Sequence, residues 1–425
     1  MSEVVQKKKI SLTNKILIST VIGLVGGTII GPRIALIKVV GDIFLRLIQM
    51  SVPIIILGSV TDAIGSLKPK DLGKLGFKMF AWFMIPTFIA AALGYMMALI
   101  LKPGVGLPAI ELQSEIMPVP QSIETIVLNF FSTNIVRSLS EGSMIQVIVF
   151  AILLGTAISL IGAETGDYTL ITLIKKVNEA VLRVIKIVML IAPIGVGALM
   201  AWVAGTMGFK IILPLIKYLG GIAAATAIVM ILMICVAAIY CKVNPFKLAG
   251  KLADMSLVAA TTTSSAISLP VKMADSVNKI GISERISNFV NPVGMVLNST
   301  GQALFLSMAS IMIAQFFQID LSIGRTIQVI VISTLACMGT LAVPGGALVV
   351  LASLMPTLGF PPEGIALIAG VDWFRGIFTT IPNVACDALI AMIIAKDEGE
   401  LYYEVFNGEL TATEAAEKYA KTQTT

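Results

Sequence analysis

The run Ile286–Ile319, ISNFVNPVGMVLNSTGQALFLSMASIMIAQFFQI, carries no charged side chain and is interrupted near its middle by Asn298-Ser299-Thr300-Gly301. It exceeds the roughly 20 apolar residues with which a helix crosses a bilayer. Backbone that leaves the helix at membrane depth must be buried in protein or line a wet cavity, because lipid cannot satisfy its polar groups. The stretch therefore predicts a broken membrane span, which we favour over a simple kink.

The composition of the whole chain agrees with this reading. Hydrophobic residues make up 57% of the 425 residues and charged residues only 13%, whereas soluble domains carry about a quarter charged residues. The sequence has no histidine, and its four cysteines lie in apolar stretches without metal-ligand spacing. We expect an all-α polytopic membrane protein, and these absences argue against an enzyme.

Charge-free windows predict six spans before the midpoint. These windows are Ile16–Ile30, Leu47–Thr61, Met79–Leu101, Gly142–Ala163, Ile187–Gly208 and Tyr218–Tyr240. The second span is expected to begin near Ile34 and to carry an ion pair between Asp42 and Arg46, one helical turn apart.

The second half is cut by the polar and glycine-rich tracts Thr261–Ser265 (TTTSS) and Val343–Gly346 (VPGG), in addition to Asn298–Gly301. They predict two re-entrant hairpins, at about 245–278 and 321–357, around a broken seventh span at about 282–318. The eighth span covers about 365–396. The predicted architecture is thus eight transmembrane helices and two helical hairpins.

The distribution of lysine and arginine predicts the orientation. The N-terminus, the loop from Lys68 to Lys78 and the segment from Lys242 to Lys251 are expected in the cytoplasm, and the acidic loop 103–123 outside. The two hairpins would then enter from opposite sides as inverted repeats, with their tips near the midplane, where transporters place their sites. We expect both termini in the cytoplasm and an inner, cytoplasmic-type membrane of a prokaryotic cell.

The last span has one polar face. At about 100° per residue, Asp372, Arg375, Gly376, Thr379, Asn383 and Asp387 fall on one side of the helix. Because charges within a membrane helix are costly, such a face marks a pathway or a site. An alternative for Asp372 and Arg375, three residues apart, is that they only pair with each other.

Asp387 and Asn383 are four residues apart, so their oxygens can converge on a cation such as Na⁺. The broken segment would supply carbonyls and the Asn298 side chain. An alternative is that Asp387 carries a proton, so coupling to H⁺ stays open. The hairpin tips, Thr263-Ser264-Ser265 and Pro344-Gly345-Gly346, offer hydroxyls and amides suited to a carboxylate.

At these tracts the sequence resembles the glutamate transporter homologues, the dicarboxylate/amino acid:cation symporter family, from about residue 10 to about 396. The resemblance is carried by GDIFLRLIQMSVPIIILGSV, APIGVGAL, TTTSSAISLPV, NPVGMVLNSTGQALF, GTLAVPGGAL and VDWFRGIFTTIPNVACDAL. It implies a homotrimer whose fixed scaffold holds a transport domain that moves like an elevator. The scaffold would be 10–75 and 124–208, the transport domain 76–102 and 211–396, and 397–425 a cytoplasmic tail.

The resemblance also implies site residues. We expect a solute site at Ser264, Ser265, Gln302, Val343, Gly345, Arg375, Gly376, Thr379, Thr380 and Asn383. One Na⁺ site would use Gly294, Asn298, Asn383 and Asp387, and a second, largely backbone site would use Val296, Met338 and Thr340. A third family site is expected to be lost, since Thr300 stands where an aspartate is usual.

The solute pocket departs from the amino-acid members, because Gly376 replaces the aspartate that holds an amino group and Thr379 replaces the arginine that reads an acidic side chain. One hypothesis is a small mono- or dicarboxylate anchored by Arg375. The other is a neutral or acidic amino acid whose ammonium is held by backbone carbonyls or Asp372. A solute sensor or a channel is the alternative outside transport.

Overall fold

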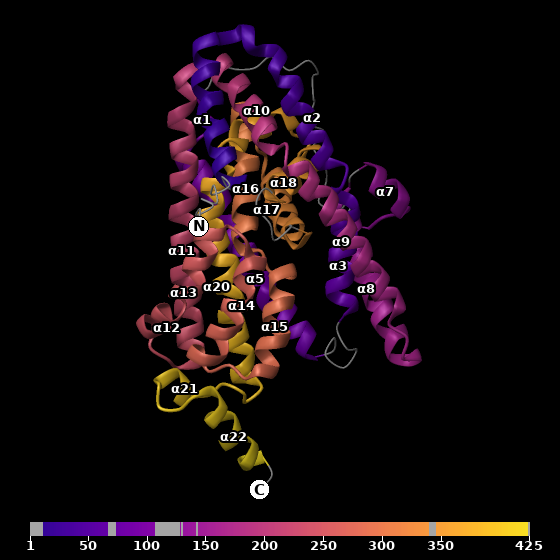
Figure 1. Cartoon of the computed structure of the whole chain (residues 1–425), viewed down its shortest axis with the longest axis vertical. Helices are drawn as coiled ribbons and strands as arrows, with labels where there is room; N and C mark the ends of the chain where they lie inside the picture. Colours follow the sequence, from indigo (N-terminus) through magenta and orange to yellow (C-terminus); the bar gives the residue numbers. More distant parts are fainter. Residues whose placement is uncertain are drawn as a thin grey trace, which may run out of the picture.

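The computed structural model describes residues 12–66, 74–106, 128, 131–141, 143–339 and 346–423. Across them the chain consists of helices joined by turns and short irregular segments, with an isolated antiparallel bridge between Ile282 and Leu401. The long helices run nearly parallel to the long axis of the molecule, and the C-terminus lies beyond one end of the bundle (Figure 1).

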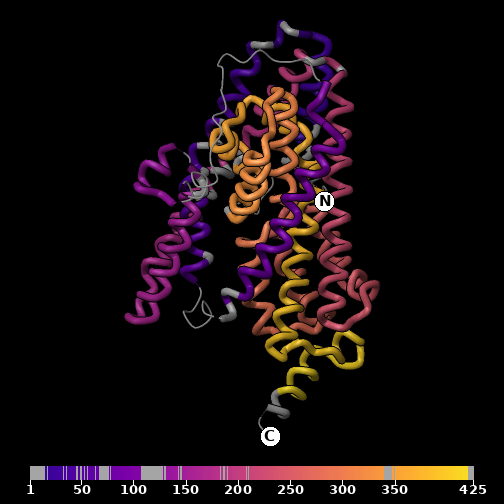
Figure 2. The backbone as a smooth tube through the Cα atoms, turned by 180° about the vertical axis from the view of Figure 1, so that it is seen from behind, coloured from indigo at the N-terminus to yellow at the C-terminus, as the bar shows by residue number. Residues whose placement is uncertain are grey.

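The N-terminal half contributes two groups of helices. They are α1 (Leu12–Ile30), η1 (Gly31–Ile37), α2 (Lys38–Gln49), α3 (Val52–Gly65), α7 (Ile135–Glu141), α8 (Met144–Thr165), α9 (Thr169–Met189), α10 (Ala192–Met207) and η2 (Gly208–Ile211). Helix α1 packs along α10, while α3 packs against α8 and α9. The α3, α7, α8 and α9 group projects to one side of the bundle (Figures 1 and 2).

Glycine sets the close approach of α1 and α10. A Cβ at Gly27 would lie 2.1 Å from the carbonyl oxygen of Ala201, so only glycine lets the two backbones meet there. In α2 the expected ion pair is wrong in its partner: Asp42 pairs with Lys38, at 3.0 Å, rather than with Arg46. Lys38 and Arg46 each lie one helical turn from Asp42, and in the structure Asp42 pairs with Lys38.

The remaining helices form the part of the molecule that holds the candidate site. They are α5 (Lys74–Leu101), α11 (Ile212–Cys241), α12 (Pro245–Lys251), α13 (Ala253–Thr262), α14 (Ser265–Asp275), η3 (Ser276–Ile280), α15 (Glu284–Leu297), α16 (Thr300–Phe316), α17 (Ile323–Ala336), η4 (Cys337–Gly339), α18 (Gly346–Leu358), η5 (Pro362–Ile365), α19 (Ala366–Ala369) and α20 (Asp372–Asp397). Helix α16 packs against both α5 and α20, and α20 also packs against α11, α13 and α15. Figure 2 shows α20 alongside α11 and α5 from behind.

Local sequence explains the two places where this part leaves the helix. Helix α13 ends at Thr263, whose φ of +49° is left-handed, and Ser264 then caps α14 by accepting a hydrogen bond from the Ile267 amide. Helices α15 and α16 are separated by Asn298 and Ser299, which both have non-helical backbone angles. The break expected over four residues thus occupies two, because Thr300 and Gly301 already belong to α16.

Five of the described helical segments are long and apolar enough to cross a membrane. The most apolar window is 89% buried in Glu284–Phe316 and 83% buried in Asp372–Asp397, but 39% buried in Lys78–Leu101, Gln146–Thr165 and Ile212–Cys241. The outer helices expose large apolar side chains such as Ile29 (78%) and Ile239 (79%). Such a surface suits lipid. The protein is a multi-pass helical membrane protein in which α15–α16 and α20 run through the interior.

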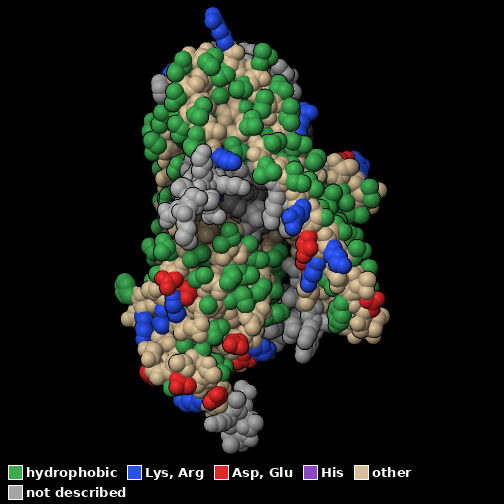
Figure 3. All heavy atoms as spheres, in the orientation of Figure 1, with side chains coloured by type: hydrophobic (Ala, Val, Ile, Leu, Met, Phe, Trp, Pro, Cys, Tyr) green, Lys and Arg blue, Asp and Glu red, His purple; other side chains and the backbone are tan. Residues whose placement is uncertain are grey.

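The C-terminal helix α21 (Tyr403–Asn407) packs against η3 at the end of this bundle, and α22 (Ala412–Gln423) packs against α21 and extends away from the bundle (Figure 1). The Tyr402 amide donates to the Gly281 carbonyl at 2.7 Å, and the Ser283 amide donates to the Glu400 carbonyl at 3.1 Å. The Arg285 guanidinium pairs with the Glu400 carboxylate at 2.5 Å. Charged side chains gather over this end of the molecule (Figure 3).

Candidate functional site

The polar face of α20 lies inside the protein. Its members Asp372, Arg375, Thr379, Asn383 and Asp387 are all at most 8% exposed. Helix α20 continues through Pro382 without a break. A buried face of this kind needs partners for every charge, because an unpaired buried ion costs several kcal/mol. The structure supplies two separate sets of partners along the helix.

The first set surrounds Arg375. Its Nε and Nη2 atoms donate to Asp372 Oδ1 at 3.0 and 2.6 Å. Its Nη1 atom donates to Gln302 Oε1 and to Thr379 Oγ1, both at 2.9 Å. The guanidinium also stacks on the Phe305 ring, 4.3 Å from its centroid. Arg375 therefore pairs with Asp372 and at the same time lies beside two residues expected in the solute site.

Gly376 lies next to the tip of the first hairpin. A Cβ on Gly376 would stand 3.3 Å from the Thr263 Cβ, so this glycine lets the tip approach α20. The Thr263 hydroxyl is buried and has no hydrogen-bond partner among the described residues. A buried polar group of this kind calls for a ligand or water. Gly376 and Thr263 are thus closely packed, and neither residue provides a carboxylate.

Thr380 and Asn383 continue this face. The Thr380 hydroxyl donates to the Gly376 carbonyl at 2.7 Å, and Asn383 Oδ1 accepts a hydrogen bond from the Gly301 amide at 2.7 Å. The Asn383 side-chain NH₂ makes no hydrogen bond within the described part of the chain, so it can donate to a solute. Ser264 and Ser265, at 2% and 7% exposed, begin α14 at the same hairpin tip.

The second set surrounds Asp387, and it contains a residue that the sequence reasoning missed. Lys272 of α14 places its Nζ atom 2.5 Å from Asp387 Oδ2 and 3.0 Å from the Asn291 carbonyl oxygen. Both charged side chains are 0% exposed. On the other side, Asn298 Nδ2 donates to Asp387 Oδ1 at 2.8 Å. The carboxylate is therefore held between an ammonium and an amide.

The rest of this cluster orients Asn298. Its Oδ1 atom lies 3.0 Å from the Thr87 hydroxyl and 2.9 Å from the Thr300 hydroxyl. Gly294 allows α15 to reach Asp387, since a Cβ at this position would lie 2.6 Å from Asp387 Oδ1. The structure thus brings together three of the four residues expected for the first Na⁺ site, Gly294, Asn298 and Asp387, along with Thr87 and Thr300. The fourth, Asn383, lies one helical turn before Asp387 on α20, and its Oδ1 atom binds the Gly301 amide.

The arrangement of these atoms does not fit a Na⁺ ion. Na⁺ requires oxygen ligands, but Asp387 faces the Lys272 ammonium and the N–H of Asn298. The Oδ1 atoms of Asn298 and Asn383 already accept hydrogen bonds from Thr87, Thr300 and Gly301. The positive charge beside Asp387 is the ammonium group of Lys272.

The other expected residues are only partly covered by the structure. Val296 lies in α15 and Met338 in η4, and these two elements pack against each other. Thr340, Val343 and Gly345, which belong to the second Na⁺ site and to the second hairpin tip, lie outside the described residues.

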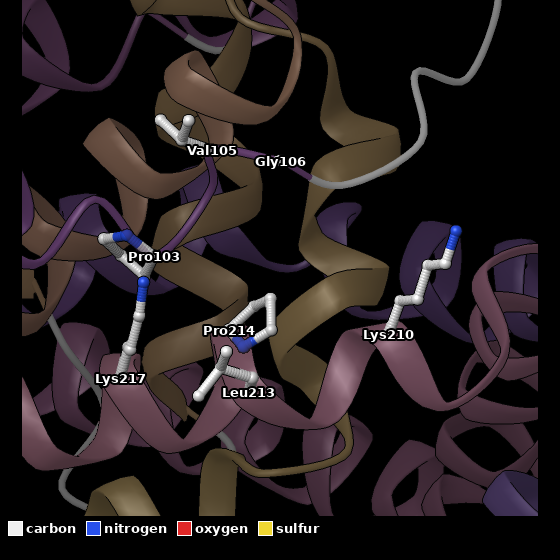
Figure 4. A pocket seen from close by; sticks show the side chains of 7 residues that line it. All are labelled: Pro103, Val105, Gly106, Lys210, Leu213, Pro214 and Lys217. Carbon is white, nitrogen blue, oxygen red and sulfur yellow. The ribbon is translucent and has the colours of Figure 1, made fainter.

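A separate groove of about 290 Å³ lies where α5 ends and α11 begins. Pro103, Val105, Gly106, Lys210, Leu213, Pro214 and Lys217 line it. The labelled residues come from the turn that follows α5, from η2 and from α11 (Figure 4). Since no residue of α20 lines it, it is distinct from the polar face.

One signal in the sequence could have indicated Lys272. It lies in the hairpin tract expected at membrane depth, two residues after Pro270, where a charged side chain requires a buried partner. Asp387 lies 115 residues further along the chain, so spacing along one helix could not join the two.

Comparison with known proteins places these features in a family. The model of the sodium:dicarboxylate symporter family matches residues 12–397. The chain is 32% identical over 392 residues to a proton/glutamate-aspartate symporter of Bacillus subtilis, covering 90% of this chain and 94% of the relative. It is 32% identical over 430 residues to a C4-dicarboxylate transport protein of the same species, covering 97% and 98%.

A further relative, a proton/sodium-glutamate symport protein of Bacillus caldotenax, is 33% identical over 407 residues, covering 92% of this chain and 96% of the relative. The names of all three relatives include a carboxylate solute. The two symporter names add a coupling ion, a proton in one and a proton and sodium in the other. With a buried polar face on its last long helix, a broken helix beside it and a match over nearly its whole length, the chain belongs to the sodium:dicarboxylate symporter family.

Proposed function

We propose that this protein is a secondary active symporter that carries a small dicarboxylate across the membrane with a monovalent cation. The observation that carries the choice of solute is the Arg375 guanidinium, which lies beside Gln302 and Thr379 on the buried face of α20. Its Nε and Nη2 atoms now bind Asp372 and its Nη1 atom binds Gln302 and Thr379. A solute carboxylate would therefore bind the guanidinium through two parallel hydrogen bonds by replacing some of these contacts. This guanidinium would favour a solute whose second end is a carboxylate over one whose second end is apolar or carries an ammonium group.

The first carboxylate would bind nearer the hairpin tip. Donors without a full positive charge are available there. They are the Asn383 NH₂ group, the amides at the start of α14 and the Thr263 hydroxyl, which has no partner among the described residues. Helix N-termini favour anions because their amides point outward. One carboxylate at the tip and one at Arg375 would place the carbon chain of the solute near Gly376, which has no side chain of its own and packs beside Thr263.

An amino acid is the second candidate, and the names of the glutamate symporters among the relatives favour it. Its ammonium would need a carboxylate or several carbonyl oxygens. Asp372 Oδ1 already accepts two N–H groups of Arg375, and Gly376 has no side chain. Backbone carbonyls of the hairpin tips would therefore have to hold the ammonium, so we rank this solute second.

The coupling and the movement are also part of the proposal. Na⁺ would bind at Val296, Met338 and Thr340, with H⁺ as the alternative coupling ion. Residues 76–102 and 211–396 would move as a transport domain against a scaffold of 10–75 and 124–208, within a homotrimer whose termini are cytoplasmic. The packing of α16 and α20 against α5, distant in sequence, supports grouping α5 with the later helices.

Uptake by proteoliposomes tests the proposed function. Purified protein should accumulate labelled succinate or fumarate when a Na⁺ or H⁺ gradient is imposed, and unlabelled dicarboxylates should compete better than butyrate. Imposing each gradient alone, with the other ion clamped on both sides, identifies the coupling ion. Uptake of aspartate or serine without any uptake of dicarboxylates would favour the second candidate, and no uptake of either class under any gradient would refute symport.

A further inference from the structure

We propose that Lys272 is a built-in cation, whose ammonium permanently takes the place of a dissolved alkali ion beside Asp387. This inference deepens the proposed function, because it states that one cation position of the symporter is closed to ions from solution. It concerns the place formed by Asp387, Asn298 and the Asn291 carbonyl, and it leaves open the second position at Val296 and Met338.

Distance and burial are the first argument. The ammonium lies 2.5 Å from Asp387 Oδ2 and 3.0 Å from the Asn291 carbonyl oxygen. These are the two oxygen types, carboxylate and carbonyl, that hold hard cations. Both side chains of the pair are 0% exposed, so water cannot compete with the contact. A positive group thus already satisfies the ligands that an ion would need.

The orientation of Asn298 is the second argument. An ion beside Asp387 would attract the amide oxygen of Asn298, but the amide turns its NH₂ group to the carboxylate. Its oxygen is held on the opposite side by the hydroxyls of Thr87 and Thr300. Thr300 stands where sodium-coupled relatives are expected to carry an aspartate, so the surrounding residues present a neutral network to the pair.

The charge balance of α20 is the third argument. Its buried face carries the carboxylates of Asp372 and Asp387, and these are paired with Arg375 and Lys272 respectively. Each carboxylate therefore has a basic side chain of its own at hydrogen-bond distance. The face is electrically balanced by side chains alone, and an added alkali ion at Asp387 would leave an unbalanced buried charge, which is costly.

Lys272 also joins separate elements. It projects from α14, while Asp387 belongs to α20 and Asn291 to α15. A dissolved ion could leave such a junction during a transport cycle, but a side chain remains attached. The hairpin arm α14 should consequently stay bound to α20 whether or not salt is present.

Cation binding in the absence of solute tests this inference. We would measure ²²Na⁺ binding and the thermal unfolding temperature of the full-length protein as Na⁺ replaces choline at constant ionic strength. Lys272→Thr should bind an additional Na⁺ per chain and show a new, saturable rise in unfolding temperature. The matched double variant Lys272→Thr/Asp387→Asn, which lacks the carboxylate, should lose both. Equal Na⁺ binding by the unaltered protein and a folded Lys272→Thr variant would overturn the inference.

A second measurement uses the unaltered protein, so the inference stays testable if the variants do not fold. Crystals of the protein would be soaked in a Tl⁺ salt, with Tl⁺ as an electron-rich substitute for a smaller monovalent cation. The anomalous electron-density map should show no Tl⁺ within ligand distance of Asp387. Density there would refute a built-in cation. Because neither readout needs transport, a protein that moved no dicarboxylate would still give these results, and failure of the proposed function is distinguished from failure of this inference.

Discussion

The assignment of Arg375 to the second carboxylate of the solute can be tested with a pair of variants. Arg375→Met alone would leave Asp372, which is 8% exposed, as an unpaired buried carboxylate and cost about 3–5 kcal/mol of stability. The double variant Asp372→Asn/Arg375→Met removes both charges, and we expect it to recover most of that loss. The single variant Asp372→Asn keeps the guanidinium and frees the two N–H groups that now bind Asp372 Oδ1.

The expected effect on binding follows from these contacts. A hydrogen bond to a charged group contributes about 1.5–3 kcal/mol, so loss of the guanidinium should weaken succinate binding about 10- to 100-fold. Butyrate, which has one carboxylate, should bind the double variant and the unaltered protein equally. Asp372→Asn should bind succinate at least as tightly as the unaltered protein, because its guanidinium no longer has a competing carboxylate.

Isothermal titration of purified protein with both acids measures these affinities, with thermal unfolding as the check on folding. If the double variant bound succinate as tightly as the unaltered protein, Arg375 would serve only to balance Asp372. An equal loss of succinate and butyrate binding would instead show that the variant damages the whole pocket, and the assignment would be wrong in that case as well.

Two further predictions concern packing and the tail. Gly27→Ala should lower the thermal unfolding temperature and cost about 1–3 kcal/mol of stability, because its Cβ would lie 2.1 Å from the Ala201 carbonyl oxygen. The neighbouring Gly26→Ala is the control and should be neutral, since a Cβ there meets open space. Equal effects of the two variants would contradict the α1–α10 packing. In the tail, a hydrogen bond from Lys418 lowers the pKa of Glu404 below its ordinary value, so the contact stabilises docked α22 at neutral pH and is lost as the pH falls through that lowered pKa. The protection of the α22 amides, measured relative to their intrinsic exchange rates at each pH, should therefore fall on acidification, and Glu404→Gln should remove this pH dependence. An unchanged pH profile would show that the contact does not hold the helix.

The features predicted from the sequence are those written in consecutive residues. Asn298 and Ser299 interrupt the interior helix because small polar residues follow a long apolar run, and the polar face of α20 follows from helical periodicity alone. Both features depend only on residues that are close in sequence, so they can be predicted without knowledge of the fold. The family resemblance rests on the same tracts and is confirmed by the family match.

The pairing of charges was not predictable in this way. Lys272 and Asp387 lie on different helices, and only the packing of α14 against α20 brings them together. The partner of Asp42 was predicted wrongly for a smaller reason, since Lys38 and Arg46 each lie one helical turn away from it. The Lys272–Asp387 pair depends on the packing of two helices, and the Lys38–Asp42 pair depends on which of two equally spaced basic residues meets Asp42. Spacing along the sequence predicts neither pair.

The docked tail gives an experimental handle on movement. The bridge between Ile282 and Leu401 and the pair between Arg285 and Glu400 join the tail to the start of α15. A fluorophore attached to α22 would therefore report the position of α15 and α20, and a partner dye on α8 would mark the side group of helices. If the proposed transport domain moves against the proposed scaffold, energy transfer between the two dyes should change in single molecules, without any label near the solute.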